Sequence, residues 1–181
     1  MSSNKKHYII TAVTLGAIAA ASGVLIGATN LITKGQIEQN EINKVKQGIA
    51  EIFKKEDLKY QGFELNEAGL NEEDYKYVNY LYVVKDANDN DIGCVFKTSG
   101  SNMYGKISLI VGYDATSQDF VNLSVVTNEQ TYASTLVENY INPLQEGERE
   151  VDDVTCGATY GAKLIRDMVH DAEKAAIEYY K

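Results

Sequence analysis

The sequence has no tryptophan, one proline, two cysteines and two histidines in its 181 residues. So few histidines exclude a histidine-rich metal site. The two cysteines, Cys94 and Cys156, match no zinc or redox motif by their spacing. They would form one disulfide in an oxidising compartment or remain two buried thiols, and the sequence leaves both possibilities open. Without tryptophan, the 13 tyrosines supply most of the aromatic mass of the core.

Basic residues are also scarce, with 17 Lys and Arg against 26 Asp and Glu and a net charge of −9. In residues 1–32 the only charged side chains are those of Lys5 and Lys6. Residues 33–181 therefore contain 15 basic and 26 acidic residues and have a net charge of −11. An acidic domain repels phosphate backbones, so we expect no nucleic-acid partner. The sequence also contains no phosphate-binding loop of the nucleotidase type.

The longest uncharged run extends from Tyr8 to Ile32. About 20 apolar residues span a bilayer as a helix, so the run predicts an N-terminal tail and transmembrane anchor over residues 1–33 that contacts membrane lipid. Because Lys5 and Lys6 precede the run, we expect a single-pass protein of the cell membrane with a cytoplasmic N-terminus and an extracytoplasmic domain. A cleaved signal peptide ending near Ala19–Ala21 is the alternative. The apolar run continues beyond that point, which favours an uncleaved anchor.

The rest of the chain predicts an α+β fold, in which an antiparallel sheet is flanked by helices. Residues 34–56 have an apolar face at helical spacing and predict an amphipathic linker helix, followed by the domain proper over residues 57–181. Four runs rich in valine and tyrosine predict strands. These runs are residues 75–85, 92–97, 106–113 and 120–127. Two helices are expected at residues 131–141, ended by Pro143, and at residues 161–180.

The segment Asp153–Thr159, which reads Asp-Val-Thr-Cys-Gly-Ala-Thr, carries the strongest chemical signal. Gly157 and Ala158 allow close approach of the backbone to a ligand. The predicted helix that follows offers free amide groups and a positive dipole end to a phosphate. Thr159 places a hydroxyl at that point. From the residues alone, an ordinary N-cap explains Thr159 better than a ligand site does.

This segment resembles Asp-x-x-Ser-Gly-Ala-Thr, the flavinylation motif of the FMN-binding domain family. The motif occurs in the G subunit of the Rnf ion-translocating ferredoxin:NAD oxidoreductase complex and in the related C subunit of Nqr. The chain resembles the Rnf G subunit over nearly its whole length, from its short basic start through a predicted span and a helix that opens with Thr33-Lys34. Gly-Ser-Asn-Met-Tyr-Gly-Lys-Ile at residues 100–107 resembles the glycine-rich turn of the family, and Glu129 stands where the family has a Glu-Thr-Pro-Gly turn.

The resemblance implies that a flavin transferase joins the phosphate of FMN covalently to Thr159. Asp153, the acid of the motif, would serve recognition or transfer, and the cofactor would lie against neighbouring motif and turn residues. The full cofactor-binding set implied is Thr159, Ala158, Gly157, Cys156, Asp153, Glu129, Tyr104 and Met103. No metal site and no catalytic residue is expected.

The sequence departs from the family pattern in three places. Cys156 replaces the serine of the motif, and Gly161 and Ala162 replace hydroxyl residues that often follow the threonine. Glu129 is followed by Gln-Thr-Tyr instead of Thr-Pro-Gly. The change after Glu129 concerns the shape of the flavin pocket more than the attachment. The replacements at Gly161 and Ala162 imply the loss of two phosphate ligands, so that the amide groups at the start of the helix would hold more of the phosphate.

The function implied is electron transfer by one subunit of a membrane-bound Rnf-like complex, which couples electron flow to Na⁺ or H⁺ movement. The chain would act as a relay and would not catalyse the overall reaction by itself. Its partners would be the other membrane subunits and the flavin transferase. Two alternatives remain: a stand-alone membrane-anchored flavinylated protein for extracellular electron transfer, and an anchored binding module without flavin.

Overall fold

The computed structural model describes residues 8, 13–16, 18–20, 22–23, 40 and 42–181. The chain divides into two compact units, Met1–Asn43 and Lys44–Lys181. All strands and the site described below belong to the second unit.

The transmembrane helix included in the predicted fold class is not borne out and is corrected here. Within the described residues, no helix combines the length and the apolar character needed to cross a membrane. The other residues of the run from 8 to 32 lie outside the described residues.

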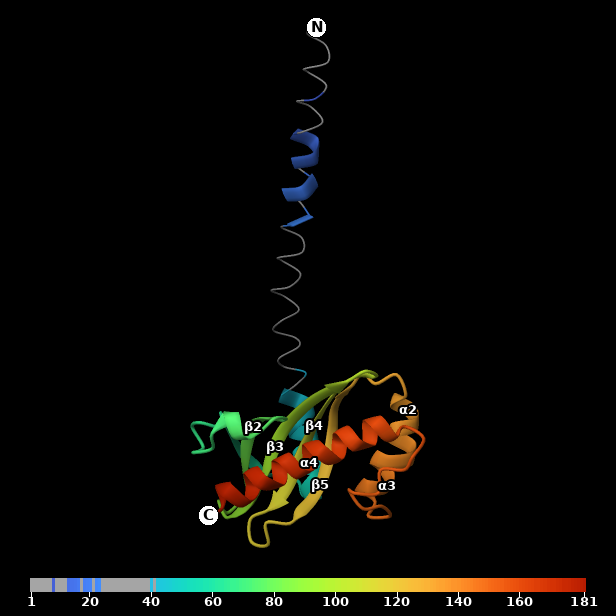
Figure 1. The fold of residues 1–181 in the computed structure, drawn as a ribbon. Coiled ribbons are helices and arrows are strands. Elements are labelled where there is room, and N and C mark those ends of the chain that lie inside the picture. Colours follow the sequence, from blue (N-terminus) through green and yellow to red (C-terminus); the bar gives the residue numbers. More distant parts are fainter. Residues whose placement is uncertain (1–7, 9–12, 17, 21, 24–39, 41) are drawn as a thin grey trace. The chain divides into compact units, whose positions relative to one another are not determined.

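The second unit is built on one antiparallel sheet whose five strands follow chain order (Figure 1). The strands are β1 (Lys59–Phe63), β2 (Val78–Lys85), β3 (Asp91–Asn102), β4 (Gly105–Asp114) and β5 (Phe120–Asn128), and the short 3₁₀ helix η1 (Glu72–Asp74) precedes β2. β3 extends beyond the predicted 92–97 and pairs with β4 as far as Asn102 opposite Gly105. The glycine-rich segment is therefore mostly strand, and only Met103 and Tyr104 form its turn.

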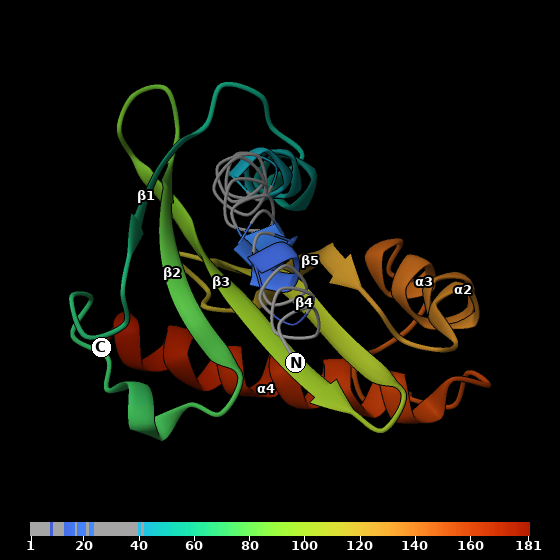
Figure 2. The same ribbon diagram turned by 90° about the horizontal axis from the view of Figure 1, so that it is seen from above.

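The helix α4 (Thr159–Tyr179) covers one face of the sheet (Figure 2). Its apolar stripe, which includes Leu164, Ile165 and Met168, packs into the main core with residues of β3 and β4. The buried hydroxyl of Tyr113 donates to the Val169 carbonyl at 2.7 Å and fixes the helix against the strand.

Residues 44–53 of the second unit are helical and cover the opposite face of the sheet. Val45, Ile49 and Ile52 are buried in a second core with Val95 and Ile110 among the sheet residues. Because both faces are covered, β4 is buried over seven consecutive residues, 107–113. A strand that is buried on both faces has a nearly continuous apolar sequence, and in β4 this run is interrupted only by Ser108.

Beyond β5 the chain forms three short helical elements at that edge of the sheet (Figure 2). They are α2 (Ala133–Leu136), the π-helical η2 (Val137–Ile141) and α3 (Asn142–Gln145). Pro143 was expected to end the helix, but it lies in the first turn of α3. Because α2, η2 and α3 follow one another without a break, Pro143 lies inside one continuous helical segment, directly after the wider π turn of η2.

Candidate functional site

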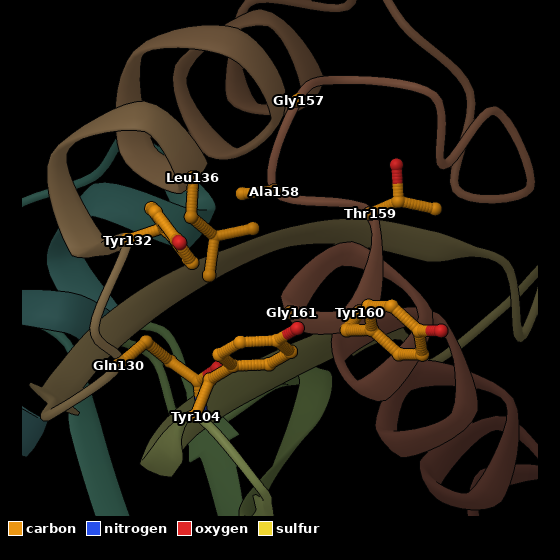
Figure 3. Close-up of a pocket in the computed structure, with 9 residues that line it drawn as sticks. All are labelled: Tyr104, Gln130, Tyr132, Leu136, Gly157, Ala158, Thr159, Tyr160 and Gly161. Carbon is orange, nitrogen blue, oxygen red and sulfur yellow. The ribbon is translucent and has the colours of Figure 1, made fainter.

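A pocket of about 290 Å³ lies where three segments meet: the β3–β4 turn, the start of α2 and the start of α4 (Figure 3). This volume is at the small end of the range for ligand sites, about 300 Å³ and above. The lining residues are Tyr104, Gln130, Tyr132, Leu136, Gly157, Ala158, Thr159, Tyr160 and Gly161.

The floor of the pocket is formed by the β3–β4 turn, which is clamped against residues 129–131. The Thr131 amide donates to the Tyr104 carbonyl at 2.7 Å, and the Glu129 amide donates to the Lys106 carbonyl at 2.8 Å. The buried Gln130 side chain adds a bond from its Nε2 to the Gly105 carbonyl. Gly105 has φ +132°, and a Cβ there would lie 2.1 Å from the Glu129 carbonyl oxygen, so only glycine allows this close approach.

Three tyrosine rings gather at the pocket, and we call them the tyrosine cluster. The Tyr104 ring lies between Tyr132 and Tyr160, with centroid separations of 5.6 Å to each. Both pairs are inclined, which is the favoured geometry for aromatic contacts. The outer rings are 53% and 60% exposed, so the cluster offers aromatic surface to a ligand. Asn102 donates to the Tyr160 carbonyl at 3.1 Å and ties the turn to α4.

Thr159 is the first residue of α4, and Ala158 is its N-cap, without a side-chain hydrogen bond. The interpretation of Thr159 as an ordinary N-cap is therefore wrong. The first amide groups of a helix have no intrahelical partners and carry a partial positive charge. A helix start without a side-chain cap, next to a hydroxyl and a pocket, is suited to a phosphate ester.

Of the predicted cofactor-binding residues, four line the pocket: Thr159, Ala158, Gly157 and Tyr104. Cys156 is buried just before them and does not line it. Met103 is 82% exposed at the tip of the turn. Glu129 is exposed beside Gln130, and its main-chain amide and carbonyl groups meet the β3–β4 hairpin. Asp153 also lies outside the lining, where it pairs with Arg149 at 3.3 Å.

Both cysteines are buried and free, so neither forms the disulfide that the sequence left open. Cys94 packs in the main core with Tyr180, at the C-terminal end of α4, whereas Cys156 lies just before the N-terminal end. The two cysteines thus lie near opposite ends of a helix of 21 residues, which is about 30 Å long. Because a disulfide needs Cα atoms within about 7 Å, the two thiols are too far apart to pair.

Sequence reasoning did not place five lining residues in the pocket: Gln130, Tyr132, Leu136, Tyr160 and Gly161. Their positions gave partial signals, because Gln130 and Tyr132 follow Glu129 and Tyr160 follows Thr159. Gly161 replaces a family hydroxyl, and a Cβ there would lie 2.8 Å from Cδ2 of Leu136. Leu136 had no signal, because only the tertiary fold brings α2 to the start of α4.

The pocket combines a hydroxyl, an uncapped helix start and aromatic rings, which together suit a phosphorylated aromatic cofactor. Within the part of the chain that the structure describes, no three His, Cys, Asp or Glu side chains converge as a metal site would require. Burial raises the pKa of the Tyr140 hydroxyl above its ordinary value, and this hydroxyl donates to the Val151 carbonyl at 2.5 Å. Tyr140 therefore has a structural role behind the site.

Comparison with known proteins gives one family match. Residues 1–52 match the family model described as the RnfG N-terminal region. No curated protein matches the chain. The match lies outside the pocket-forming residues, so it supports the resemblance independently of the Thr159 motif. It confirms the RnfG-like character of residues 1–52.

Proposed function

We propose that this chain is an electron-transfer subunit of an Rnf-like ion-translocating complex and carries FMN bound covalently through its phosphate to Thr159. The observation that carries the proposal is the position of Thr159. Its hydroxyl stands at an uncapped helix start that lines a pocket with three tyrosine rings. The family match at residues 1–52 gives independent support for the Rnf-like assignment.

The attachment requires an FMN donor with a leaving group on phosphorus, such as a flavin dinucleotide, and a flavin transferase. A bond forms between the Thr159 oxygen and the phosphorus atom of the flavin phosphate. The diphosphate P–O bond breaks, a nucleoside monophosphate leaves, and the hydroxyl proton passes to solvent. No oxidation or reduction accompanies this step.

The residues present fit such a group. Amide groups at the start of α4 are placed to stabilise the phosphate charge. The tyrosine cluster offers ring faces and edges for contact with an aromatic ring system. Because the pocket has only about 290 Å³, it would enclose part of the cofactor and leave the remainder accessible to a redox partner.

Bound FMN supplies the ability to exchange one or two electrons. The protein would hold it in place through Thr159 and restrict its orientation through the tyrosine cluster. A covalent bond prevents loss of the flavin, which matters most where a free cofactor would diffuse into the medium. We therefore keep the extracytoplasmic placement of residues 57–181 as part of the proposal.

The test is intact mass of the full-length protein produced together with an active flavin transferase. We expect a mass gain of about 440 Da, corresponding to one FMN less water, in the wild type. Thr159→Ala should abolish the gain. Thr155→Ala is the matched control, because it removes an exposed threonine hydroxyl from the same loop and should retain the gain.

Absence of the mass gain in the wild type, with the transferase active on a control acceptor, would overturn the proposal and favour a binding module without flavin. Purification of the flavinylated chain then separates the remaining alternatives. Co-purification of membrane subunits supports the Rnf-like complex, whereas a flavinylated protein that purifies alone under the same mild conditions supports the stand-alone carrier.

A further inference from the structure

The loop that leads to Thr159 is held by side chains instead of regular secondary structure. We call residues 151–158 the motif loop. Four of its carbonyl groups accept hydrogen bonds from side chains outside the loop. Tyr140 donates to Val151 at 2.5 Å, Arg149 to Asp153 at 2.8 Å and to Thr155 at 3.1 Å, and Asn139 to Cys156 at 3.3 Å.

Arg149 makes more of these bonds than any other side chain. Its Nη1 donates to both the Asp153 and Thr155 carbonyls, and it lies 3.3 Å from Oδ2 of Asp153. The Arg149 side chain is only 20% exposed, so these contacts are partly shielded from solvent. Arginine suits this arrangement because its planar guanidinium presents several donors in fixed directions.

The contacts of Arg149 end close to the attachment residue. Thr155 lies four residues before Thr159, and the chain then turns through Gly157 at φ +79°. The N-cap side chain adds no hydrogen bond to this turn. The position of the Thr159 hydroxyl therefore depends on the carbonyl contacts just before it.

Asp153 contacts Arg149 and does not line the pocket. Its carboxylate holds the guanidinium in the position from which it reaches the two carbonyls. An acid that contacts the cofactor would be expected in the lining.

We propose that Arg149 is the positioning residue for FMN attachment at Thr159, and that Asp153 acts through Arg149 instead of through the cofactor. This inference rests on the proposed function. Removal of the guanidinium leaves the carbonyls of Asp153 and Thr155 without that donor, so the motif loop keeps only the side-chain contacts from Tyr140 and Asn139 and loses order. The loop must then be ordered during transfer, which slows the reaction.

The test measures the initial rate of FMN incorporation into full-length variants by intact mass, with purified transferase and flavin dinucleotide. We expect Arg149→Ala to lower the rate at least tenfold. Arg149→Lys keeps the charge but has a single nitrogen, so it should recover only part of the rate. Arg166→Ala is the matched control, because Arg166 pairs with Asp167 at 2.7 Å and has a similar exposure of 32%. It should react at the wild-type rate.

A double-mutant cycle tests the role of Asp153. Asp153→Asn should slow attachment in the wild type but add little in the Arg149→Ala background, since the carboxylate would have no guanidinium to hold. Thermal unfolding of each variant separates positioning from folding. Slow attachment in variants that unfold near the wild-type temperature supports the proposal. If Arg149→Ala does not fold, the rate of FMN incorporation into Arg149→Lys tests the proposal instead.

Two results would overturn the inference while leaving the proposed function intact. One is wild-type rates in both Arg149 variants. The other is an equal slowing by Asp153→Asn in both backgrounds, which would give Asp153 an independent role. Failure of the wild type itself to gain FMN would instead overturn the proposed function, and this inference with it.

Discussion

At the scale of single residues, the pocket depends on positions where a larger side chain cannot fit. Gly105 is the sharpest case, because it joins the Tyr104 turn to residues 129–131. Tyr104 is central to the tyrosine cluster, so the geometry of the cluster depends on the conformation of the adjacent glycine. Gly161 is a second such position, because a Cβ there would lie 2.8 Å from Cδ2 of Leu136. The packing of Leu136 therefore disfavours a larger residue at position 161.

Gly105→Ala should destabilise the protein by more than about 3 kcal/mol, because the unfavourable φ adds to a clash with the Glu129 carbonyl. Gly69→Ala is the matched control. Gly69 also has a positive φ, +81°, but a Cβ there meets nothing within 4 Å, so the expected cost is about 1–2 kcal/mol. Urea unfolding of the two full-length variants measures the difference. Equal losses would contradict the role assigned to close packing at Gly105.

At the scale of elements, the helical residues 42–53 complete the second core of the sheet. Their buried side chains, Val45, Ile49 and Ile52, recur at helical spacing and face one side. Within the predicted amphipathic helix of residues 34–56, the described residues 42–53 are helical, and the helix ends at Phe53 instead of residue 56. Its contribution to stability comes from burial against the sheet, because an isolated helix of this length is marginal in water.

Ile49→Ala should lower the free energy of unfolding by about 2–5 kcal/mol, since Ile49 is 1% exposed and its loss leaves a cavity. Ile42→Ala removes the same atoms from a residue that is 51% exposed, and should change stability by no more than about 0.5 kcal/mol. Denaturant unfolding of both variants tests this difference. A large loss for Ile42→Ala would show that the exposed side of the helix has a structural partner.

At the scale of the whole molecule, titrating groups in the turns and the core should limit the pH range of stability. Hydrogen bonds from the Ser117 and Thr116 amides lower the pKa of Asp114, and bonds from Asn90 and Asn88 lower that of Asp86. Their stabilisation is present above the unfolded pKa, about 3.9, and is lost as the pH falls through the folded values. Burial raises the pKa of Cys94 from 9.0 to about 12, so its stabilisation is lost as the pH rises through that interval.

We therefore expect the thermal unfolding temperature to be nearly constant between about pH 5 and pH 8 and to fall on both sides. Asp114→Asn should reduce the acid dependence. Cys94→Ala should move the alkaline fall in unfolding temperature to higher pH. In that variant the fall is caused by ionisation of groups such as Tyr113, whose hydroxyl has a pKa raised by burial. Unfolding temperatures measured across pH 2 to 11 test this expectation. An alkaline fall unchanged by Cys94→Ala would show that other groups control it.

The sequence by itself determined four of the five strands of the antiparallel sheet, the C-terminal helix and the motif at Thr159, but it did not predict the strand β1. Period-two alternation and a helical apolar stripe are local patterns that follow from the geometry of each element. The same local reasoning was wrong for the predicted transmembrane helix, which the described residues do not contain, and for Pro143, which lies inside a helical segment. It also assigned Thr159 to an N-cap, a position that Ala158 occupies.

Only the tertiary structure decided which residues share the pocket and which support it. Leu136 and Tyr132 reach Thr159 because the elements after β5 fold back towards the start of α4, and no spacing in the sequence encodes that approach. Tertiary packing also separated the motif residues, with Thr159 in the pocket and Asp153 against Arg149. Spacing along the chain fixes which element carries a residue, but the direction of a side chain in an irregular loop depends on distant hydrogen-bond partners.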